Sequence, residues 1–359
     1  MTESGAGTGA AATGLPAQVL GHRRATGPLL VATGVLLGAA ALGVSIGPAD
    51  LPLSEVARVL ASHLPFVHLH VNPTDDAIVW QVRFPRVVLG AMVGAMLSGG
   101  GAAYQGVFRN PLADPYLLGV AAGAGLGATV AIVHGTGTHL LLPLSAFIGA
   151  ALAVALTYAL GAGGSRQSST GAIVLAGVAV AALFTSVQTF LLQRHSQSLE
   201  EVYTWILGRL SSATWGDVGL MAPYALVSAV VLLLHRRLLD VLRVGEDEAE
   251  SLGVRAERVR IVVVVAATLG TASAVAVSGL IGFIGIIVPH TVRLAAGGSY
   301  RRVLPVSMVA GGAFLILADV VARTLQSPAE VPIGVVTAFV GAPFFLFVLR
   351  SRRAQQGVR

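Results

Sequence analysis

Three patterns in this sequence combine residue types that could do chemistry. Residues 43–47 read GVSIG and match the G-x-S-x-G turn that exposes a catalytic serine, but no strand, turn and helix surround them. His63, His68 and His70 lie close together, yet no cysteine or carboxylate completes a set of metal ligands around them. Residues 123–128 read G-x-G-x-x-A, which binds a dinucleotide only inside a β-α-β unit. We therefore predict no catalytic residue, no metal site and no bound cofactor.

The densest group of charged side chains lies between Arg236 and Arg260. It holds six arginines and six carboxylates, and long apolar segments precede and follow it. Because such charges are too costly to place in hydrocarbon, the stretch must lie in water. Gly245 and Gly253 divide it, and we expect one short helix over residues 247–252 and another from Arg255 onward. The stretch is either a solvated connection or a surface on which a partner acts.

The composition indicates a protein that crosses a membrane many times. The chain is 55% hydrophobic and 11% charged, and its mean hydropathy is +0.79, which is too apolar for a soluble protein of this length. It has no cysteine, which excludes disulfides and thiolate metal sites. All 23 basic residues are arginine. Because a Walker A loop needs a lysine, the chain is not itself a P-loop ATPase.

The apolar segments predict an all-α polytopic membrane protein with about ten transmembrane helices. The expected spans are residues 29–46, 87–107, 116–133, 140–160, 173–192, 217–235, 261–277, 279–293, 303–320 and 333–349. Residues 1–28 form a Gly/Ala/Thr-rich segment that we expect to be a disordered cytoplasmic tail. Residues 29–350 are expected to form the transmembrane domain, and residues 351–359 a second cytoplasmic tail.

The eighth expected span, residues 279–293, has an unusual composition for a membrane helix. It carries glycines at 279, 282 and 285 and a proline at 289. Such residues at membrane depth indicate a broken half-helix, which is tolerated only where the backbone packs in protein or lines a cavity. We therefore predict that Gly282 and Gly285 face either a translocation path or a closely packed helix.

The distribution of arginine predicts the orientation of the chain. Cytoplasmic loops of membrane proteins are enriched in basic residues, and ten spans place both termini on the same side. With both termini in the cytoplasm, six of the 23 arginines lie outside and the other 17 lie inside or at the inner interface. The six outer arginines are Arg58, Arg83, Arg86, Arg194, Arg209 and Arg323. The opposite orientation would invert this ratio.

Three classes of transport protein fit such a chain to different degrees. An ion-coupled carrier usually needs ionisable residues near the middle of the membrane, whereas Asp114, Asp217, Asp319 and Glu330 all fall at the ends of expected spans. A passive pore has no need of a charged cytoplasmic surface. An importer subunit driven by a separate ATPase explains both the charged stretch and the missing lysine. The carrier and the pore remain the alternatives.

Seven segments resemble the FecCD family, the membrane permeases of ABC importers for iron–siderophores, haem and cobalamin. They are residues 83–86 (RFPR), 105–118 (QGVFRNPLADPYLL), 175–178 (LAGV), 246–254 (EDEAESLGV), 282–290 (GFIGIIVPH), 317–323 (LADVVAR) and 330–343 (EVPIGVVTAFVGAP). The resemblance implies a subunit of the cell inner membrane that works with two ATPases, a substrate-binding protein and a second permease copy, as a homodimer or with a paralogue. An iron–siderophore is the first expected ligand, followed by cobalamin and haem.

The resemblance also implies roles for individual residues. The surface that couples to the ATPase would be Glu246, Asp247, Glu248, Ala249, Glu250, Ser251, Leu252 and Gly253. The cytoplasmic gate would contain Asn110, Leu112, Ser168, Ser169 and Thr170. Arg83, Arg86 and Arg323 would receive carboxylates of the binding protein, and single substitutions of such exposed charges should be mild. The sequence departs from the family at residues 298–301 (GSYR), where many relatives carry an aspartate.

Overall fold

Residues 26–135, 140–162, 170–327 and 329–356 are described in a computed structural model of the chain. Within them, seven helices are long and apolar enough to cross a membrane, and three shorter apolar helices accompany them. The long helices are α1 (Thr26–Ser45), α4 (Phe84–Val107), α6 (Leu141–Ala162), α7 (Thr170–Arg194), α9 (Trp215–Leu242), α11 (Ala256–Ser278) and α13 (Tyr300–Thr324). The shorter ones are α5 (Val120–Val133), α12 (Ile284–Ala296) and α14 (Ile333–Gln356).

These helices confirm the predicted all-α membrane fold. Each of the ten expected spans coincides with one of them, and the described part of the chain contains no β-strand. Of the expected N-terminal tail, residues 1–28, the first 25 lie outside the described residues. The last three belong to α1, which begins at Thr26. At the other end of the chain, α14 continues through the first six residues of the expected C-terminal tail.

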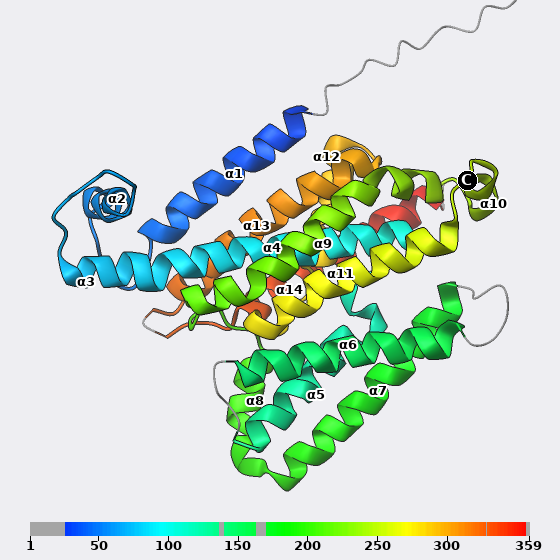
Figure 1. The fold of residues 1–359 in the computed structure, drawn as a ribbon, viewed down its shortest axis with the longest axis horizontal. Helices are drawn as coiled ribbons and strands as arrows, with labels where there is room; N and C mark the ends of the chain where they lie inside the picture. Colours follow the sequence, from blue (N-terminus) through cyan, green and yellow to red (C-terminus); the bar gives the residue numbers. More distant parts are fainter. Residues whose placement is uncertain (1–25, 136–139, 163–169, 328, 357–359) are drawn as a thin grey trace, which may run out of the picture.

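Short helices lie at the two ends of the bundle. At one end, which we call the α2 end, are α2 (Leu53–Ser62), α3 (Pro73–Asp76) and η1 (Ala77–Arg83), a π-helix that leads directly into α4. At the opposite end, the α10 end, α10 (Glu246–Ser251) connects α9 to α11 (Figure 1). The first residue of α1 and the last residues of α14 both lie at the α10 end, as an even number of crossings requires.

Helix α4 forms the centre of the larger group of helices and packs against α9, α11, α12 and α13, while α5, α6 and α7 form a second group beside α11. Glycine makes the closest of these contacts possible. A Cβ atom on Gly101 would overlap the backbone of Gly285, and one on Gly94 would overlap the backbone of Gly311. Small residues at such crossings are typical of membrane helices, because close backbone approach replaces the hydrophobic driving force that lipid removes.

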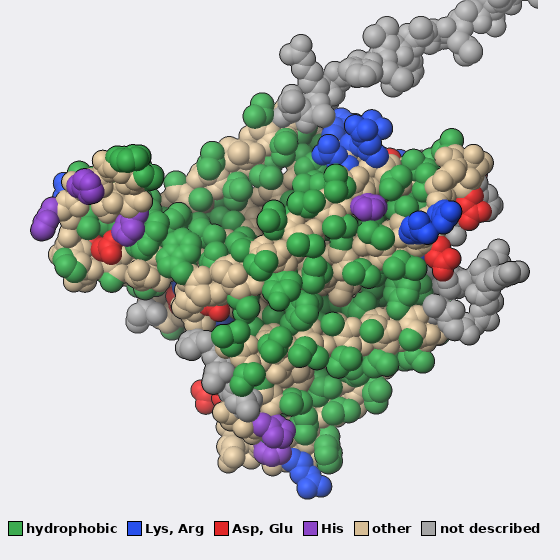
Figure 2. Space-filling model, in the orientation of Figure 1, with side chains coloured by type: hydrophobic (Ala, Val, Ile, Leu, Met, Phe, Trp, Pro, Cys, Tyr) green, Lys and Arg blue, Asp and Glu red, His purple; other side chains and the backbone are tan. Residues whose placement is uncertain are grey.

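The surface has the character expected of a protein surrounded by lipid. On the face drawn in Figure 2, apolar side chains cover the middle of the molecule, and most charged side chains lie towards its edges. Leu175, Leu226 and Leu234 are among the large apolar residues exposed on the long helices. In water such a surface would aggregate, but in a bilayer it is the favourable one.

Candidate functional site

The charged connection between α9 and α11 folds as a small platform built on one buried alanine. Ala249 of α10 is fully buried, and its carbonyl oxygen accepts the Val254 N–H at 2.9 Å. Gly253 follows α10 in the left-handed conformation, with φ of 76°, which ends the helix at the expected glycine. Glu248, Glu250, Ser251 and Leu252 are exposed. Only the backbone of Glu246 and Asp247 is described.

Two apolar side chains flank these carboxylates. Val244 and Leu252, on either side of α10, are 72% and 70% exposed. A connection that only needed to be soluble would place polar residues there, whereas an apolar centre with a charged rim is the usual composition of a protein interface. The platform therefore has the character of a contact surface, which favours the second interpretation of the charged stretch.

The base of the platform is attached to the turn between α12 and α13. The two oxygens of Asp240 on α9 accept hydrogen bonds from the Tyr300 N–H at 2.6 Å and from the Ser299 hydroxyl at 2.7 Å. Arg243 Nη1 donates to the Gly298 carbonyl oxygen at 2.6 Å. The contacts occupy the segment where the sequence departs from the family pattern. In this chain the aspartate at this contact is Asp240 on α9, and it accepts the Tyr300 N–H, which has no partner inside α13 because it lies in the first turn.

The predicted gate residues Asn110 and Leu112 lie in the connection between α4 and the 3₁₀ turn η2 (Pro115–Leu118). Asn110 Oδ1 accepts the Leu112 N–H at 3.0 Å, and its carbonyl oxygen accepts the Ala113 N–H at 3.1 Å, so the Asn110 side chain shapes this turn. Leu112 is half-buried. Ser168 and Ser169 lie outside the described residues, and Thr170 is described only as the first residue of α7.

The eighth span is broken, and its two candidate glycines have different surroundings. α11 ends at Ser278, and α12 begins at Ile284. Gly279 and Phe283, the residues next to these two helix ends, both have φ close to 70°. Gly285 is buried, and a Cβ atom there would lie 2.6 Å from Pro115 Cδ and 3.1 Å from the Leu97 carbonyl oxygen. Gly282 has no atom within 4 Å of such a Cβ position. Gly285 therefore meets a close neighbour, and Gly282 faces open space.

Gly282 and Phe283 line an apolar groove of about 640 Å³ between three elements of the chain. The other walls come from α14 and from the end of α8 (Leu199–Ile206) with the residue after it. Their lining residues include Leu207, Ala338 and Phe339. Phe283 is not glycine and yet has a positive φ, a strained conformation that concentrates at functional positions.

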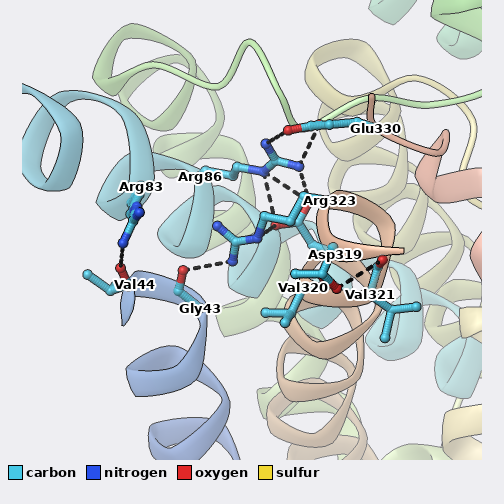
Figure 3. Close-up of polar contacts among 10 residues, drawn as sticks. Gly43, Val44, Arg83, Arg86, Asp319, Val320, Val321, Arg323 and Glu330 are labelled. Atoms are coloured by element: carbon cyan, nitrogen blue, oxygen red, sulfur yellow. Dashed lines mark hydrogen bonds and ion pairs between the residues drawn. The ribbon is translucent and has the colours of Figure 1, made fainter. Parts of the chain in front are cut away.

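A buried cluster of ion pairs joins three helices at the α2 end (Figure 3). Arg86 on α4 donates from Nε and Nη2 to Asp319 on α13, with distances of 2.7–3.0 Å. It also donates from Nη1 and Nη2 to both oxygens of Glu330, at 2.8 and 2.9 Å. Arg323 Nε lies 3.6 Å from Asp319 Oδ2, and its Nη2 donates to the Gly43 carbonyl oxygen on α1 at 2.7 Å.

Arg83 attaches the end of α1 to the start of α4. Its Nη1 donates to the carbonyl oxygens of Val44 at 3.1 Å and Ser45 at 2.8 Å, and its Nη2 donates to the Ala49 carbonyl oxygen. These carbonyl groups have no partner inside α1, because they belong to its end or lie beyond it. In the GVSIG segment that resembled a catalytic turn, the backbone carbonyl groups thus accept hydrogen bonds from arginine side chains.

This geometry corrects what the sequence predicted for the three outer arginines. Arg83, Arg86 and Arg323 are only 3%, 6% and 2% exposed, and the chain supplies their partners itself. Docking of another protein to these guanidinium groups would require an exchange of partners. Glu330, whose side chain is 30% exposed, is the member of the cluster nearest to solvent. The expectation that single substitutions are mild assumed exposed charges, and the burial of these three arginines contradicts that assumption.

Comparison with known proteins places the chain in a family. Residues 35–351 match the model of the FecCD transport family. The chain belongs to this family. The matched residues include α4, α10, α12 and the whole arginine cluster, so every element of the site described above is part of the FecCD fold.

Named FecCD relatives cover nearly the full length of the chain. The cobalamin import system permease protein BtuC of Halobacterium salinarum is 38% identical over 91% of this chain and 91% of its own. The hemin transport system permease protein HmuU of Yersinia pestis is 36% identical over 84% of this chain and 92% of its own. A solved structure, described as an inward-facing metal-chelate type ABC transporter, is 29% identical and has a TM-score of 0.78 over 90% of this chain and 98% of that one.

One buried polar residue of the FecCD fold received no role in the sequence analysis. Gln105 on α4 is 2% exposed. Its Nε2 donates to the Ala113 carbonyl oxygen at 3.2 Å and to the Gly285 carbonyl oxygen at 2.9 Å, and its Oε1 accepts from Arg293. It therefore joins the gate connection to the broken span. The available signal was an uncharged amide at the end of an otherwise small and apolar helix, inside a segment already recognised as family-like.

Proposed function

We propose that this chain is the permease subunit of a binding-protein-dependent ABC importer that carries a metal chelate across the cytoplasmic membrane. The α10 platform is the observation that carries this proposal, because a partner-driven permease needs a contact surface between two spanning helices. Membership of the FecCD family supports it, as do the names of the cobalamin and hemin permeases that the chain resembles. No covalent chemistry is required of the chain, and ATP is hydrolysed by the partner.

The platform would receive the ATPase. Glu248 and Glu250 offer charge to a basic cleft, and Val244 and Leu252 offer apolar area. Since Ala249 is buried and hydrogen-bonded at the base, a force applied to α10 passes to α9 and α11 rather than bending the platform alone. Two permease copies would use two ATPase subunits, one for each platform.

A second permease copy would complete the path. The groove beside Gly282 is open along α14, where Phe339 and Phe347 are strongly exposed. A homodimer formed around this face would enclose a path with apolar walls. Such walls suit a bulky chelate that must pass without being held, so selectivity would belong to the binding protein on the opposite side of the membrane.

The α10 end would face the cytoplasm. Arg236, Arg243, Arg258 and Arg302 are among the many arginines at or near this end, while the described arginines of the α2 end are fewer and partly buried. The positive-inside rule favours this orientation. The binding protein would then approach the α2 end, where Glu330 is the accessible member of the ion-pair cluster.

Reconstitution tests this function directly. The chain would be placed in proteoliposomes with its ATPase and its binding protein, and uptake of a ferric siderophore, cobalamin and haem would be measured separately with ATP inside or outside. We expect uptake of one chelate only when ATP is on the side of the α10 platform. Uptake driven by a proton or sodium gradient without the ATPase would support a carrier, and uptake without either would support a pore.

A further inference from the structure

A continuous set of contacts leads from the base of the α10 platform to the gate connection. Asp240 holds Ser299 and Tyr300, as described above. The Tyr300 ring then lies 5.8 Å from the guanidinium carbon of Arg293 on α12, a cation–π distance. Arg293 Nη2 donates to Gln105 Oε1. Four side chains therefore span the distance from the platform to Gln105.

Gln105 ends this series with all of its polar groups in use. Its oxygen accepts from Arg293, while its nitrogen donates to Ala113 in the gate connection and to Gly285 beside the break in the eighth span. Because a buried amide cannot leave its partners without losing hydrogen bonds, the three contacts form and break together. The position of Arg293 thereby controls whether the gate connection stays attached to the broken span.

We propose that Gln105 is a positioning residue that transmits movement of the α10 platform to the gate, through Asp240, Tyr300 and Arg293. The inference rests on the proposed function, since it assumes that an ATPase moves the platform. Displacement of α9 shifts the turn between α12 and α13 and withdraws Arg293. The Gln105 amide oxygen then loses the hydrogen bond from Arg293 that orients it. Its amide nitrogen can no longer bridge the carbonyl groups of Ala113 and Gly285, so the gate connection separates from the broken span.

A second observation concerns the guanidinium group of Arg293. Among the described residues, its Nη1 is buried and has no hydrogen-bond partner. Buried polar groups are nearly always hydrogen-bonded, so an unsatisfied one calls for an explanation. A movement of Arg293 that exposed this group, or that gave it an acceptor, would remove the cost of leaving it unsatisfied.

Packing restricts the movement to this route. The close contact of Gly101 with the backbone of Gly285 ties the start of α12 to α4. The opposite end of α12 is followed by Gly297, whose φ of 84° marks a sharp turn before Gly298 and Ser299. The end of α12 that carries Arg293 lies next to this turn, so it is the end that a displacement of α9 would reach first.

The absence of cysteine allows a direct test with one reporter. Leu112→Cys places a thiol in the gate connection, and the rate of its reaction with a maleimide would be measured in the complex with the ATPase, before and after trapping with ATP and vanadate. We expect trapping to change the rate when Gln105 is present. With Gln105→Leu this nucleotide-dependent change should be lost, while the ATPase stays bound.

Gln188→Leu is the matched control. Gln188 is also a buried glutamine, on α7, and it donates to Thr129 Oγ1 at 3.0 Å, away from the contacts in question. The control should lose stability as Gln105→Leu does but retain the nucleotide-dependent change in labelling. A response lost equally in both variants would mean that Gln105 matters only for packing, and would overturn the inference.

A second variant protects the test against misfolding. Asp240→Asn acts at the other end of the series, near the surface, and should also reduce the nucleotide-dependent change. If the effects of Asp240→Asn and Gln105→Leu are independent in a double-mutant cycle, or if either variant responds like the parent, the inference is overturned. Failure of the ATPase to bind the parent chain would instead contradict the proposed function.

Discussion

The two ends of this bundle use charge in opposite ways. At the α2 end, Arg83, Arg86 and Arg323 are buried, and the carbonyl and carboxylate groups of the same chain surround them. At the α10 end, the side chains of Glu248 and Glu250 are exposed on a small helix. The first arrangement holds α1, α4 and α13 together, whereas the second leaves its charges available to another protein.

The difference teaches that residue type alone does not decide what a charge does in this protein. A buried ion pair gains little over apolar packing, but removing one partner leaves an uncompensated charge and costs several kcal/mol. An exposed charge can be changed at almost no cost to folding. The α2 end should therefore respond to mutation through stability, and the α10 end through coupling. The substitutions below test and sharpen this contrast.

A large loss of stability should come from Arg86→Met. The change leaves Glu330 without its arginine and leaves Asp319 with only Arg323, at 3.6 Å. We expect a loss of about 3–5 kcal/mol in the free energy of unfolding, measured by thermal or denaturant unfolding in detergent. The control is Arg58→Met, because Arg58 forms an exposed pair with Glu55 and should cost about 0–1 kcal/mol. Equal losses would show that burial at the α2 end does not matter.

The same reasoning applies to the double substitution Arg83→Glu with Arg86→Glu. If these arginines were exposed, the variant would fold normally and only capture the binding protein more slowly at low salt. Because both guanidinium groups are buried, we expect little folded protein in the membrane fraction. The amount would be measured by gel filtration of membranes solubilised in detergent. Normal yield with slow capture would restore the original docking assignment.

The next effect separates the two glycines of the broken span. Gly285→Leu has no room beside Pro115 and Leu97, so it should cost at least about 1–3 kcal/mol and prevent assembly. Gly282→Leu points into open space and should fold, while narrowing the groove that we assign to the path. Expression and thermal unfolding report the first effect, and uptake by folded protein reports the second. Uptake at the parent rate by Gly282→Leu would remove the groove from the path.

At the α10 end, the pair Glu248→Arg and Glu250→Arg should leave stability within about 0.5 kcal/mol, because both side chains are exposed. The expected loss is in transport. ATP hydrolysis should continue with the ATPase bound, but uptake per ATP hydrolysed should fall. Normal uptake would return the platform to a simple connection between spans.

The smallest effect should come from Leu252→Ala. Truncation of an exposed side chain at a contact surface should weaken binding of the ATPase by about 1 kcal/mol, roughly fivefold in Kd, without changing stability. Leu234→Ala is the control, since Leu234 is similarly exposed but lies on the membrane-facing surface of α9. If the two variants bind the ATPase equally well, the apolar part of the platform has no role in docking.

Much of the fold could be predicted because lipid imposes simple rules on sequence. Apolar length gave the ten spans, and glycine with proline identified the break before α12. The platform was predictable for the same reason, since twelve charged residues within a short stretch cannot be placed in hydrocarbon. These inferences need only the local sequence.

The remaining features depend on which distant residues meet. Arg86 and Asp319 are separated by 233 positions, and nothing in either segment indicates the partner. Asp319 looked like a residue at the end of a span, although it is buried between two arginines. The role of Gln105 was missed likewise, because its acceptors lie 8 and 180 positions away. Pairing of this kind follows from packing geometry, not from composition.

The π-helix η1 (Ala77–Arg83) gives the α2 end a property that an ordinary helix would lack. Its hydrogen bonds span five residues, as from the Phe84 N–H to the Val79 carbonyl oxygen, which is the mark of one residue inserted into a turn. Losing one residue here would restore a regular helix and rotate everything before it by about 100°. If the lost residue follows Trp80, then Trp80, which stacks on His63 at 3.8 Å, would rotate relative to Arg86, which lies on the other side of the turn. Length variation in this one turn can therefore reshape the α2 end independently of the long helices.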